Sequence, residues 1–190
     1  MYGGMITFLS ATPGSLPFIQ GVRQILYDTE IAVVASTAGD CRISGGHVAP
    51  EVDAALFLFA GILDTNRWWG IKGDTYATHN YLLKVAGGEP FPIGDRARAV
   101  QIARAALLDA GLTLTEAVRA QSSSLKIGAT VLPVTDEECG LLIDTGTERL
   151  PLLTYLMTAP SDTEVREIVS AAPAPPAVTD EVRAVIEGSD

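Results

Sequence analysis

Two carboxylates, Asp53 and Asp40, lie beside apolar segments, where acidic residues are uncommon unless they have a structural or functional role. Asp53 lies between Val52 and Ala54, near the start of an expected helix that is otherwise almost entirely apolar. A carboxylate in such surroundings is costly unless it is paired or hydrogen-bonded, so we interpret Asp53 as a residue of a functional site. The alternative is that Asp53, like Glu51, only complements the positive end of the helix dipole.

The second carboxylate, Asp40, follows an apolar strand and the polar residues Ser36 and Thr37. Open α/β sheets bind ligands at the carboxyl ends of their parallel strands. There Asp40 could accept a ribose hydroxyl or hold Mg²⁺, a hard cation that takes few carboxylates together with phosphate oxygens. An Asx-turn explains Asp40 equally well.

Both tryptophans of the chain stand side by side, in the segment Arg67-Trp68-Trp69-Gly70. Large aromatic side chains suit a flat ligand, and an arginine can stack on it or clamp a phosphate. This segment therefore predicts part of a ligand pocket. The alternative places one tryptophan in the core and the other at the surface.

Two Gly-Asp pairs each precede an expected helix, in Gly73-Asp74-Thr75 and in Gly94-Asp95-Arg96. The free N–H groups and carboxylates at such helix starts can contact a ligand, or they can simply cap the helices. His79 stands alone on the first of these helices, and we interpret it as a structural residue.

The turn after the first strand occupies the place where doubly wound folds bind phosphate. Its candidate phosphate-binding residues are Ser10, Gly14 and Ser15. The turn from Ser10 to Pro17 holds one glycine, two prolines that cannot donate a hydrogen bond and no lysine, so it is neither a Walker A loop nor a G-x-G-x-x-G motif. The alternative is an ordinary turn with Ser15 as the helix N-cap.

The elements around these residues predict an α/β fold with a doubly wound, mainly parallel, Rossmann-like sheet. Apolar runs at 6–9 and 31–35 predict strands, and apolar residues at helical spacing lie between them, which makes a βαβ unit with a parallel strand pair. The further expected elements are helices at 50–63, 74–85, 94–111 and 113–128 and strands at 129–132, 141–144 and 150–157.

We expect one α/β domain over residues 5–170, a Pro/Ala linker at 171–178 and a short terminal helix of the same fold at 179–190. Thr179 is the expected cap of that helix, with Val182 on its apolar face. A capped helix of this kind normally leads into another strand, so we expect the fold to be truncated at its C-terminus.

Composition excludes several classes of function. The net charge of −10 argues against nucleic-acid binding, which needs a basic surface. The longest apolar run, 54–63, falls short of the roughly 18 residues of a membrane span. Cys41 and Cys139 form no C-x-x-C motif and predict free thiols in a reducing cytoplasm. The chain has only two histidines, so a histidine-rich metal site is not expected.

Several of these motifs together resemble one family, 2-phospho-L-lactate transferase (CofD). The most specific is Arg67-Trp68-Trp69-Gly70-Ile71-x-Gly73-Asp74-Thr75. The other matching motifs, in the same order and at matching spacing, are Ile6-Thr7-Phe8-Leu9-Ser10, Thr37-Ala38-x-Asp40, Ser44-Gly45, Pro50-x-x-Asp53, Gly94-Asp95-Arg96 and Thr113-Leu114-Thr115-Glu116-Ala117, with Val131 to Asp136 as a near match.

The resemblance implies transfer of a 2-phospholactyl or enolpyruvyl phosphate group. The donor is guanylyl-activated phospholactate or phosphoenolpyruvate, the acceptor is the side-chain hydroxyl of the deazaflavin precursor of coenzyme F-420, GMP leaves and Mg²⁺ assists. A homodimer is a family tendency. Carried over by position, Asp40 and Asp53 are the implied catalytic and metal residues. The implied substrate-binding residues are Thr37, Ser44, Gly45, Asp53, Trp69, Gly70, Asp74, Thr75, Asp95 and Arg96.

The chain departs from the family mostly on the donor side. The family's first turn, G-G-T-G-T-P-K, is here Ala11-Thr12-Pro13-Gly14-Ser15-Leu16-Pro17, which lacks two glycines and the lysine. A second hypothesis is therefore a non-catalytic relative that keeps the fold and binds a deazaflavin or a partner protein.

Overall fold

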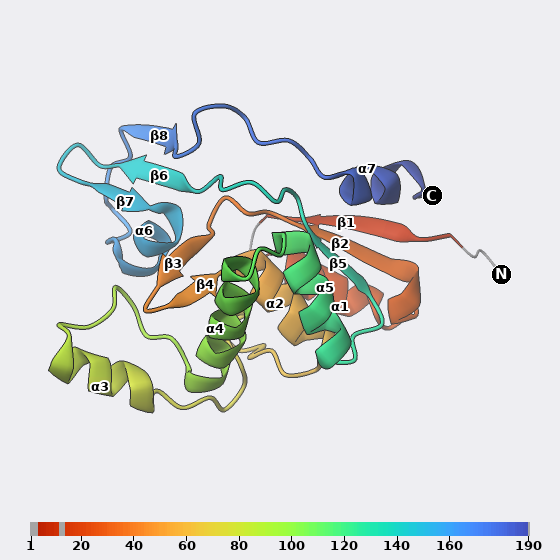
Figure 1. The fold of residues 1–190 in the computed structure, drawn as a ribbon, viewed down its shortest axis with the longest axis horizontal. Coiled ribbons are helices and arrows are strands. Elements are labelled where there is room, and N and C mark those ends of the chain that lie inside the picture. Colours follow the sequence, from red (N-terminus) through yellow and green to blue (C-terminus); the bar gives the residue numbers. More distant parts are fainter. Residues whose placement is uncertain (1–3, 12–13, 190) are drawn as a thin grey trace.

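A three-stranded parallel sheet forms the centre of the computed structural model, which describes residues 4–11 and 14–189 (Figure 1). The strand order is β1-β2-β5, with Ile6 of β1 opposite Ile31 of β2 and Ala32 of β2 opposite Thr130 of β5. The strands are β1 Ile6–Ser10, β2 Ile31–Ala35 and β5 Thr130–Pro133.

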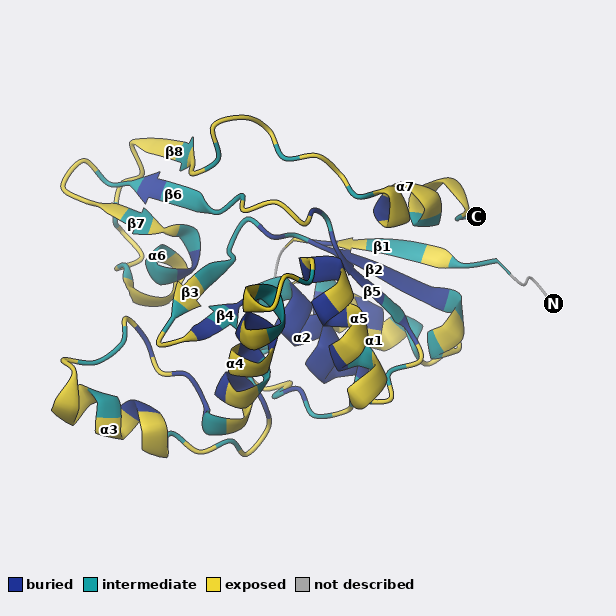
Figure 2. Ribbon diagram, in the orientation of Figure 1, coloured by how far each residue is buried: buried dark blue, intermediate teal, exposed yellow. Residues whose placement is uncertain are grey.

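Helices cover both faces of this sheet. All five residues of β2 are buried (Figure 2), which fits its continuous apolar sequence. On one face Val33 packs with the main core, which includes the helix α2, and on the other Val34 contacts Val182 of α7. The predicted doubly wound α/β fold is confirmed. The main helices are α1 Ser15–Val22, α2 Pro50–Phe59, α4 Asp95–Asp109, α5 Leu114–Ser124 and α7 Asp180–Glu187, with a short 3-10 turn at Asp28–Glu30.

The polar loop predicted between β2 and α2 is a hairpin over much of its length. Its strands are β3 Cys41–Ile43 and β4 Gly46–Val48. Ser44 and Gly45 turn the chain with φ of 48° and 82°, and two successive positive φ angles are the geometry of a tight two-residue hairpin turn.

A small antiparallel sheet, ordered β7-β6-β8, lies to one side of the parallel sheet (Figure 1). The predicted strand 150–157 is wrong beyond Pro151, because the chain there turns into the helix α6 and an apolar run of that length fits either element. The strand at 167–170 was not predicted. These elements are β6 Leu141–Asp144, β7 Arg149–Pro151, α6 Leu152–Thr158 and β8 Glu167–Ser170.

The remaining helix predictions hold with shifted ends. The helix α2 stops at Phe59 instead of near residue 63, and α3 spans Ala77–Val85. Thr113 and Glu116 form the expected capping box of α5, and Thr179 caps α7. None of the helices in the described part of the chain is long and apolar enough to cross a bilayer.

Phe57 lies at the centre of the main core, with 1% of its surface exposed. We expect Phe57→Ala to lower the free energy of unfolding by about 3–5 kcal/mol, because the substitution leaves a cavity that the packed neighbours cannot fill. Urea unfolding followed by circular dichroism measures the loss. Phe18→Ala is the control, since Phe18 is 63% exposed and should lose less than about 1 kcal/mol. Equal losses would contradict this account of the core.

Candidate functional site

A cleft of about 890 Å³ opens where the parallel strands end. The end of β2, the start of α2, the tryptophan segment, α3 and α6 all contribute to its wall. Its volume falls within the range of small-molecule sites, and it has the mainly apolar lining typical of them. The lining residues are Ala11, Leu16, Ser36, Ala38, Gly39, Pro50, Glu51, Ala54, Arg67, Trp68, Trp69, Tyr76, His79, Asn80, Pro92, Leu152, Leu153, Leu156 and Met157.

The tryptophans stand on a loop that is tied at its base. Leu63 and Ile71 form an isolated bridge, and the Asp64 N–H donates to the Gly70 carbonyl at 3.0 Å. Trp68 adopts a φ of 54°, which is uncommon for a bulky residue and marks a constrained turn. The loop therefore presents both indoles from a fixed frame.

Each tryptophan side chain packs against buried residues on one side and remains partly exposed on the other. Trp68 packs against the main core, and Trp69 packs against a second cluster in which the Phe91 ring lies edge-on, with the ring centroids 6.4 Å apart. Both indoles are half-buried and both line the cleft. The predicted alternative of one core and one surface tryptophan is wrong.

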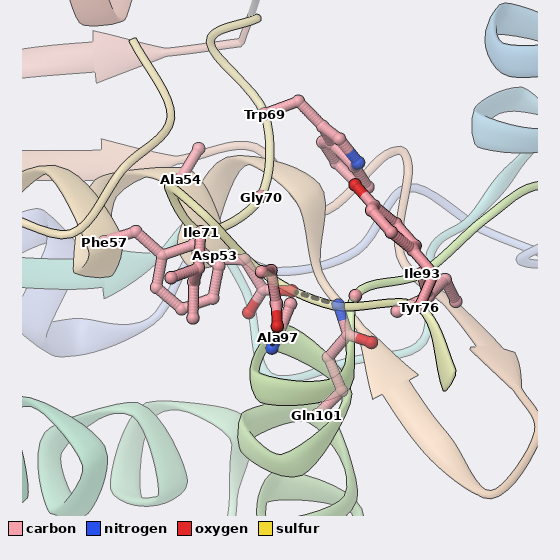
Figure 3. A pocket seen from close by; sticks show the side chains of 12 residues that line it. Asp53, Ala54, Phe57, Trp69, Gly70, Ile71, Tyr76, Ile93, Ala97 and Gln101 are labelled. Carbon is pink, nitrogen blue, oxygen red and sulfur yellow. Dashed lines mark hydrogen bonds between the residues drawn. The ribbon is translucent and has the colours of Figure 1, made fainter. Parts of the chain in front are cut away.

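Asp53 lines a small recess of about 20 Å³ beside the cleft, together with Gly70. Figure 3 shows Gln101 reaching toward Asp53 across this recess, and its amide donates to Asp53 Oδ2 at 2.9 Å. The Arg104 guanidinium donates to Asp53 Oδ1. Both oxygens of this 3% exposed residue are thus engaged inside the protein.

Arg104 is completely buried and joins four elements. Besides Asp53 of α2, it donates to the Gln121 side chain of α5 at 3.0 Å and to the His47 carbonyl of β4 at 3.1 Å. Arg104 itself stands on α4. A buried cation must be paired and hydrogen-bonded to be tolerated, and this set of partners meets that requirement.

Asp40 faces a different cavity, of about 720 Å³, which Thr37 also lines. Neither carboxylate oxygen of Asp40 has a hydrogen-bond partner among the described residues, although its side chain is only 10% exposed. Burial raises the pKa of Asp40 well above its usual value, and the Arg104 cation partly opposes this rise. Burial also lowers the pKa of the neighbouring His47 to about 4, so that imidazole is neutral at pH 7 and forms no ion pair with Asp40.

These environments fit Mg²⁺ at Asp40 but not at Asp53. Asp40 offers two free oxygens, whereas both oxygens of Asp53 are bonded to Arg104 and Gln101. The described residues contain no group of three acidic, histidine or cysteine side chains arranged to hold a metal ion. Mg²⁺ commonly takes only one or two carboxylates and completes its shell with water and phosphate oxygens.

The two Gly-Asp pairs cap each other's helices. Asp74, whose side chain is 3% exposed, accepts hydrogen bonds from the N–H groups of Arg96 and Ala97 at the start of α4. Asp95 in turn accepts from the Ala77 and Thr78 N–H groups of α3 and from the Thr75 hydroxyl. These residues thus have the capping role that the sequence left open, and their assignment to substrate binding stays a prediction.

An acid of α2, Glu51, contacts the predicted phosphate turn. The Ser10 hydroxyl lies 2.7 Å from the Ser15 hydroxyl and donates to Glu51 Oε2 at 2.9 Å. Gly14 precedes α1 as its N-cap, so the predicted capping of that helix by Ser15 is wrong. Thr12 and Pro13 lie outside the described residues. A carboxylate at this turn opposes a phosphate there unless it is protonated, and burial raises the pKa of Glu51.

One buried network was not predicted. Glu89 binds both terminal nitrogens of Arg98, at 2.7 and 2.6 Å, and lies 3.0 Å from Nδ1 of His79. The predicted site residue Ser44 also reaches Glu89 from the tip of the hairpin. Ser44 and Gly45 are exposed and lie outside the cleft lining. No local sequence pattern indicates this network, because Glu89 lies in an irregular loop.

Comparisons with known proteins relate the chain to one enzyme family. No protein-family model matches. A 2-phospho-L-lactate transferase of Methanospirillum hungatei is 38% identical over 163 residues, which are 86% of this chain and 50% of the relative. Enzymes of the same name from Methanocorpusculum labreanum and Methanothermobacter thermautotrophicus are 44% and 34% identical, over 70% and 86% of this chain and 44% and 53% of each relative.

The chain is thus a homologue of the 2-phospho-L-lactate transferases over most of its length, and it spans about half the length of these curated relatives. The family resemblance inferred from the motifs is confirmed. Two crystal structures of a UPF0052-family protein from Bacillus halodurans share the fold, with TM-scores of 0.62 and 0.59. Each is 11% identical, and the match covers the whole of this chain and 57% of that protein.

The Arg104 network predicts that replacing Arg104 alone lowers stability more than replacing Arg104 and Asp53 together. We expect Arg104→Met to lower the free energy of unfolding by about 3–5 kcal/mol, because Asp53 is left buried without its cation. Adding Asp53→Leu should recover most of the loss. Urea unfolding measures both variants. A loss below about 1 kcal/mol for the single variant, or no recovery in the double one, would contradict the role of this pair.

The reciprocal caps predict coupled effects at Asp74 and Gly94. Asp74→Ala should cost about 0.5–2 kcal/mol, as the loss of a helix cap does. Gly94→Ala should also destabilise, because its new Cβ would collide with Asp74 Oδ2. Removing the carboxylate relieves that collision, so the double variant should lose less than the sum of the two single losses. Strictly additive losses in urea unfolding would show that the two positions do not interact.

Proposed function

We propose that the chain acts as a 2-phospho-L-lactate transferase and binds the acceptor of that reaction in its cleft. In this reaction a 2-phospholactyl or enolpyruvyl phosphate group passes from a guanylyl-activated donor to the side-chain hydroxyl of the deazaflavin precursor of coenzyme F-420, and GMP leaves. The observation that carries the proposal is the position of the most specific family motif. Its residues Trp68 and Trp69 form a wall of the cleft of about 890 Å³.

The shape and chemistry of the cleft suit a flat aromatic acceptor. The indoles of Trp68 and Trp69 line the cleft together with apolar side chains of α6, including Leu153 and Leu156. A deazaflavin ring system can stack on an indole face while apolar side chains exclude water around it. Tyr76 and Asn80 also line the cleft and provide polar groups for hydrogen bonds.

Charge neutralisation is the main catalytic need of such a transfer, because negative charge spreads over the phosphoryl oxygens. Mg²⁺ supplies part of it when bound, and Asp40 is the carboxylate with oxygens free to hold it. Arg67 lines the cleft and donates to the Tyr76 hydroxyl at 3.2 Å, so it places a positive charge in the cleft, whereas Asp40 faces the other cavity. A cytoplasmic location belongs to this proposal and agrees with the two free cysteines.

A second candidate function is deazaflavin binding without catalysis. It is favoured by Glu51, whose carboxylate binds Ser10 in the turn where a donor phosphate is expected. In this case the acceptor binds in the cleft and no group is transferred.

Incubation of the purified chain with the deazaflavin precursor, the guanylyl-activated donor and Mg²⁺ distinguishes the two candidates. We expect release of GMP above a no-protein control, and a strong reduction when Mg²⁺ is removed by a chelator. GMP and the transferred product are quantified by chromatography. No GMP above the control, together with retained deazaflavin binding, would reject catalysis and support the second candidate.

A further inference from the structure

His79 of α3 stands between a buried carboxylate and the cleft. Its Nδ1 lies 3.0 Å from Glu89 Oε2, and the two side chains are only 9% and 1% exposed. The residue also lines the cleft beside Tyr76 and Asn80. Its other ring nitrogen, Nε2, makes no hydrogen bond to any residue that the structure describes. One nitrogen is therefore held by the protein, and the other is left for a ligand.

The Glu89 carboxylate fixes which nitrogen carries the proton. Burial acts to raise the pKa of Glu89, but hydrogen bonds from Arg98, Ser44 and His79 lower it to about 2. An ionised carboxylate only accepts hydrogen bonds, so Nδ1 of His79 must donate and therefore carries a proton. Whenever the imidazole is neutral, its lone pair therefore lies on Nε2.

Arg98 makes this arrangement rigid. Its two terminal nitrogens bind both oxygens of Glu89, a bidentate geometry that fixes the plane of the carboxylate. The order Arg98, Glu89, His79 follows the general pattern of an orienting acid that holds a basic imidazole toward a reacting group.

We propose that His79 Nε2 binds the attacking hydroxyl of the acceptor and takes up its proton, with Glu89 and Arg98 as positioning residues. This assignment rests on the proposed function. In the step, the acceptor oxygen forms a bond to the phosphorus that carries the lactyl group. The bond from that phosphorus to the GMP oxygen breaks, and GMP leaves with its electron pair. The hydroxyl proton ends on Nε2, where the Glu89 carboxylate stabilises the imidazolium.

Nitrogen NMR of the histidine rings tests the geometry without any need for turnover. The chain has two histidines, and the spectrum of His47→Gln assigns the remaining ring to His79. We expect the neutral ring to carry its proton on Nδ1 and not on Nε2, and we expect a shift of the Nε2 resonance when the deazaflavin precursor is added. A neutral ring with its proton on Nε2, no binding of the precursor, or binding without a shift at Nε2 would overturn the proposal.

Kinetics test the proton transfer. We expect His79→Gln to lower kcat for GMP release by about 10²- to 10⁴-fold, the range for loss of a general base, with little change in KM for the acceptor. Lys84→Gln, an exposed change on the same helix, should leave kcat unchanged. A wild-type kcat in His79→Gln would overturn the proposal. If the wild-type chain itself releases no GMP, the proposed function fails, and the NMR result alone decides whether His79 presents Nε2 to the acceptor.

Discussion

The buried guanidinium of Arg104 is the interaction on which the arrangement of this protein depends. It joins α4, on which it stands, to Asp53 of α2, to Gln121 of α5 and to the backbone of the β3–β4 hairpin at His47. The hydrogen-bond partners of a buried cation must stay in place, because each lost hydrogen bond leaves part of the charge unsolvated. These four elements are therefore fixed against one another, and they form the base beneath the site.

This constraint also decides the chemistry available at the two acids. The Arg104 cation and the Gln101 amide bind both oxygens of Asp53. Asp53 therefore lines the recess without a free oxygen for a ligand. The same cation lowers the pKa of Asp40, yet none of the described residues donates a hydrogen bond to the Asp40 oxygens. Of the two acids, Asp40 is the one that can bind a new partner without first breaking an internal bond.

Two further constraints position the walls of the cleft. The tied loop that carries Trp68 and Trp69 leads directly into the reciprocal caps of Asp74 and Asp95, which lock the starts of α3 and α4 together. The helix α3 in turn carries His79. A family motif that combines aromatic residues with a Gly-Asp pair thus serves two purposes, since its aromatic residues line the cleft and its acid holds the helices in place.

The sequence predicted the parallel sheet well, because continuous apolar strands such as 31–35 are distinctive. It missed the hairpin at 41–48, which depends on positive φ angles at Ser44 and Gly45 that no apolar pattern reveals. It also indicated that Asp53 needs a partner, but Arg104 lies 51 positions away, beyond any local spacing rule. His79 appeared structural for a related reason. Its partner Glu89 lies in an irregular loop, and only the fold brings the two together.

Quenching of intrinsic fluorescence shows whether the cleft bordered by both tryptophans binds the flat acceptor. The only two tryptophans of the chain line this cleft, so titration with the deazaflavin precursor should give saturable quenching with one ligand per chain. Leu156→Glu, which places a charge on the α6 wall, should abolish it, whereas Leu83→Glu on the exposed side of α3 should not. Quenching that does not saturate, or that is unchanged in Leu156→Glu, would contradict the account.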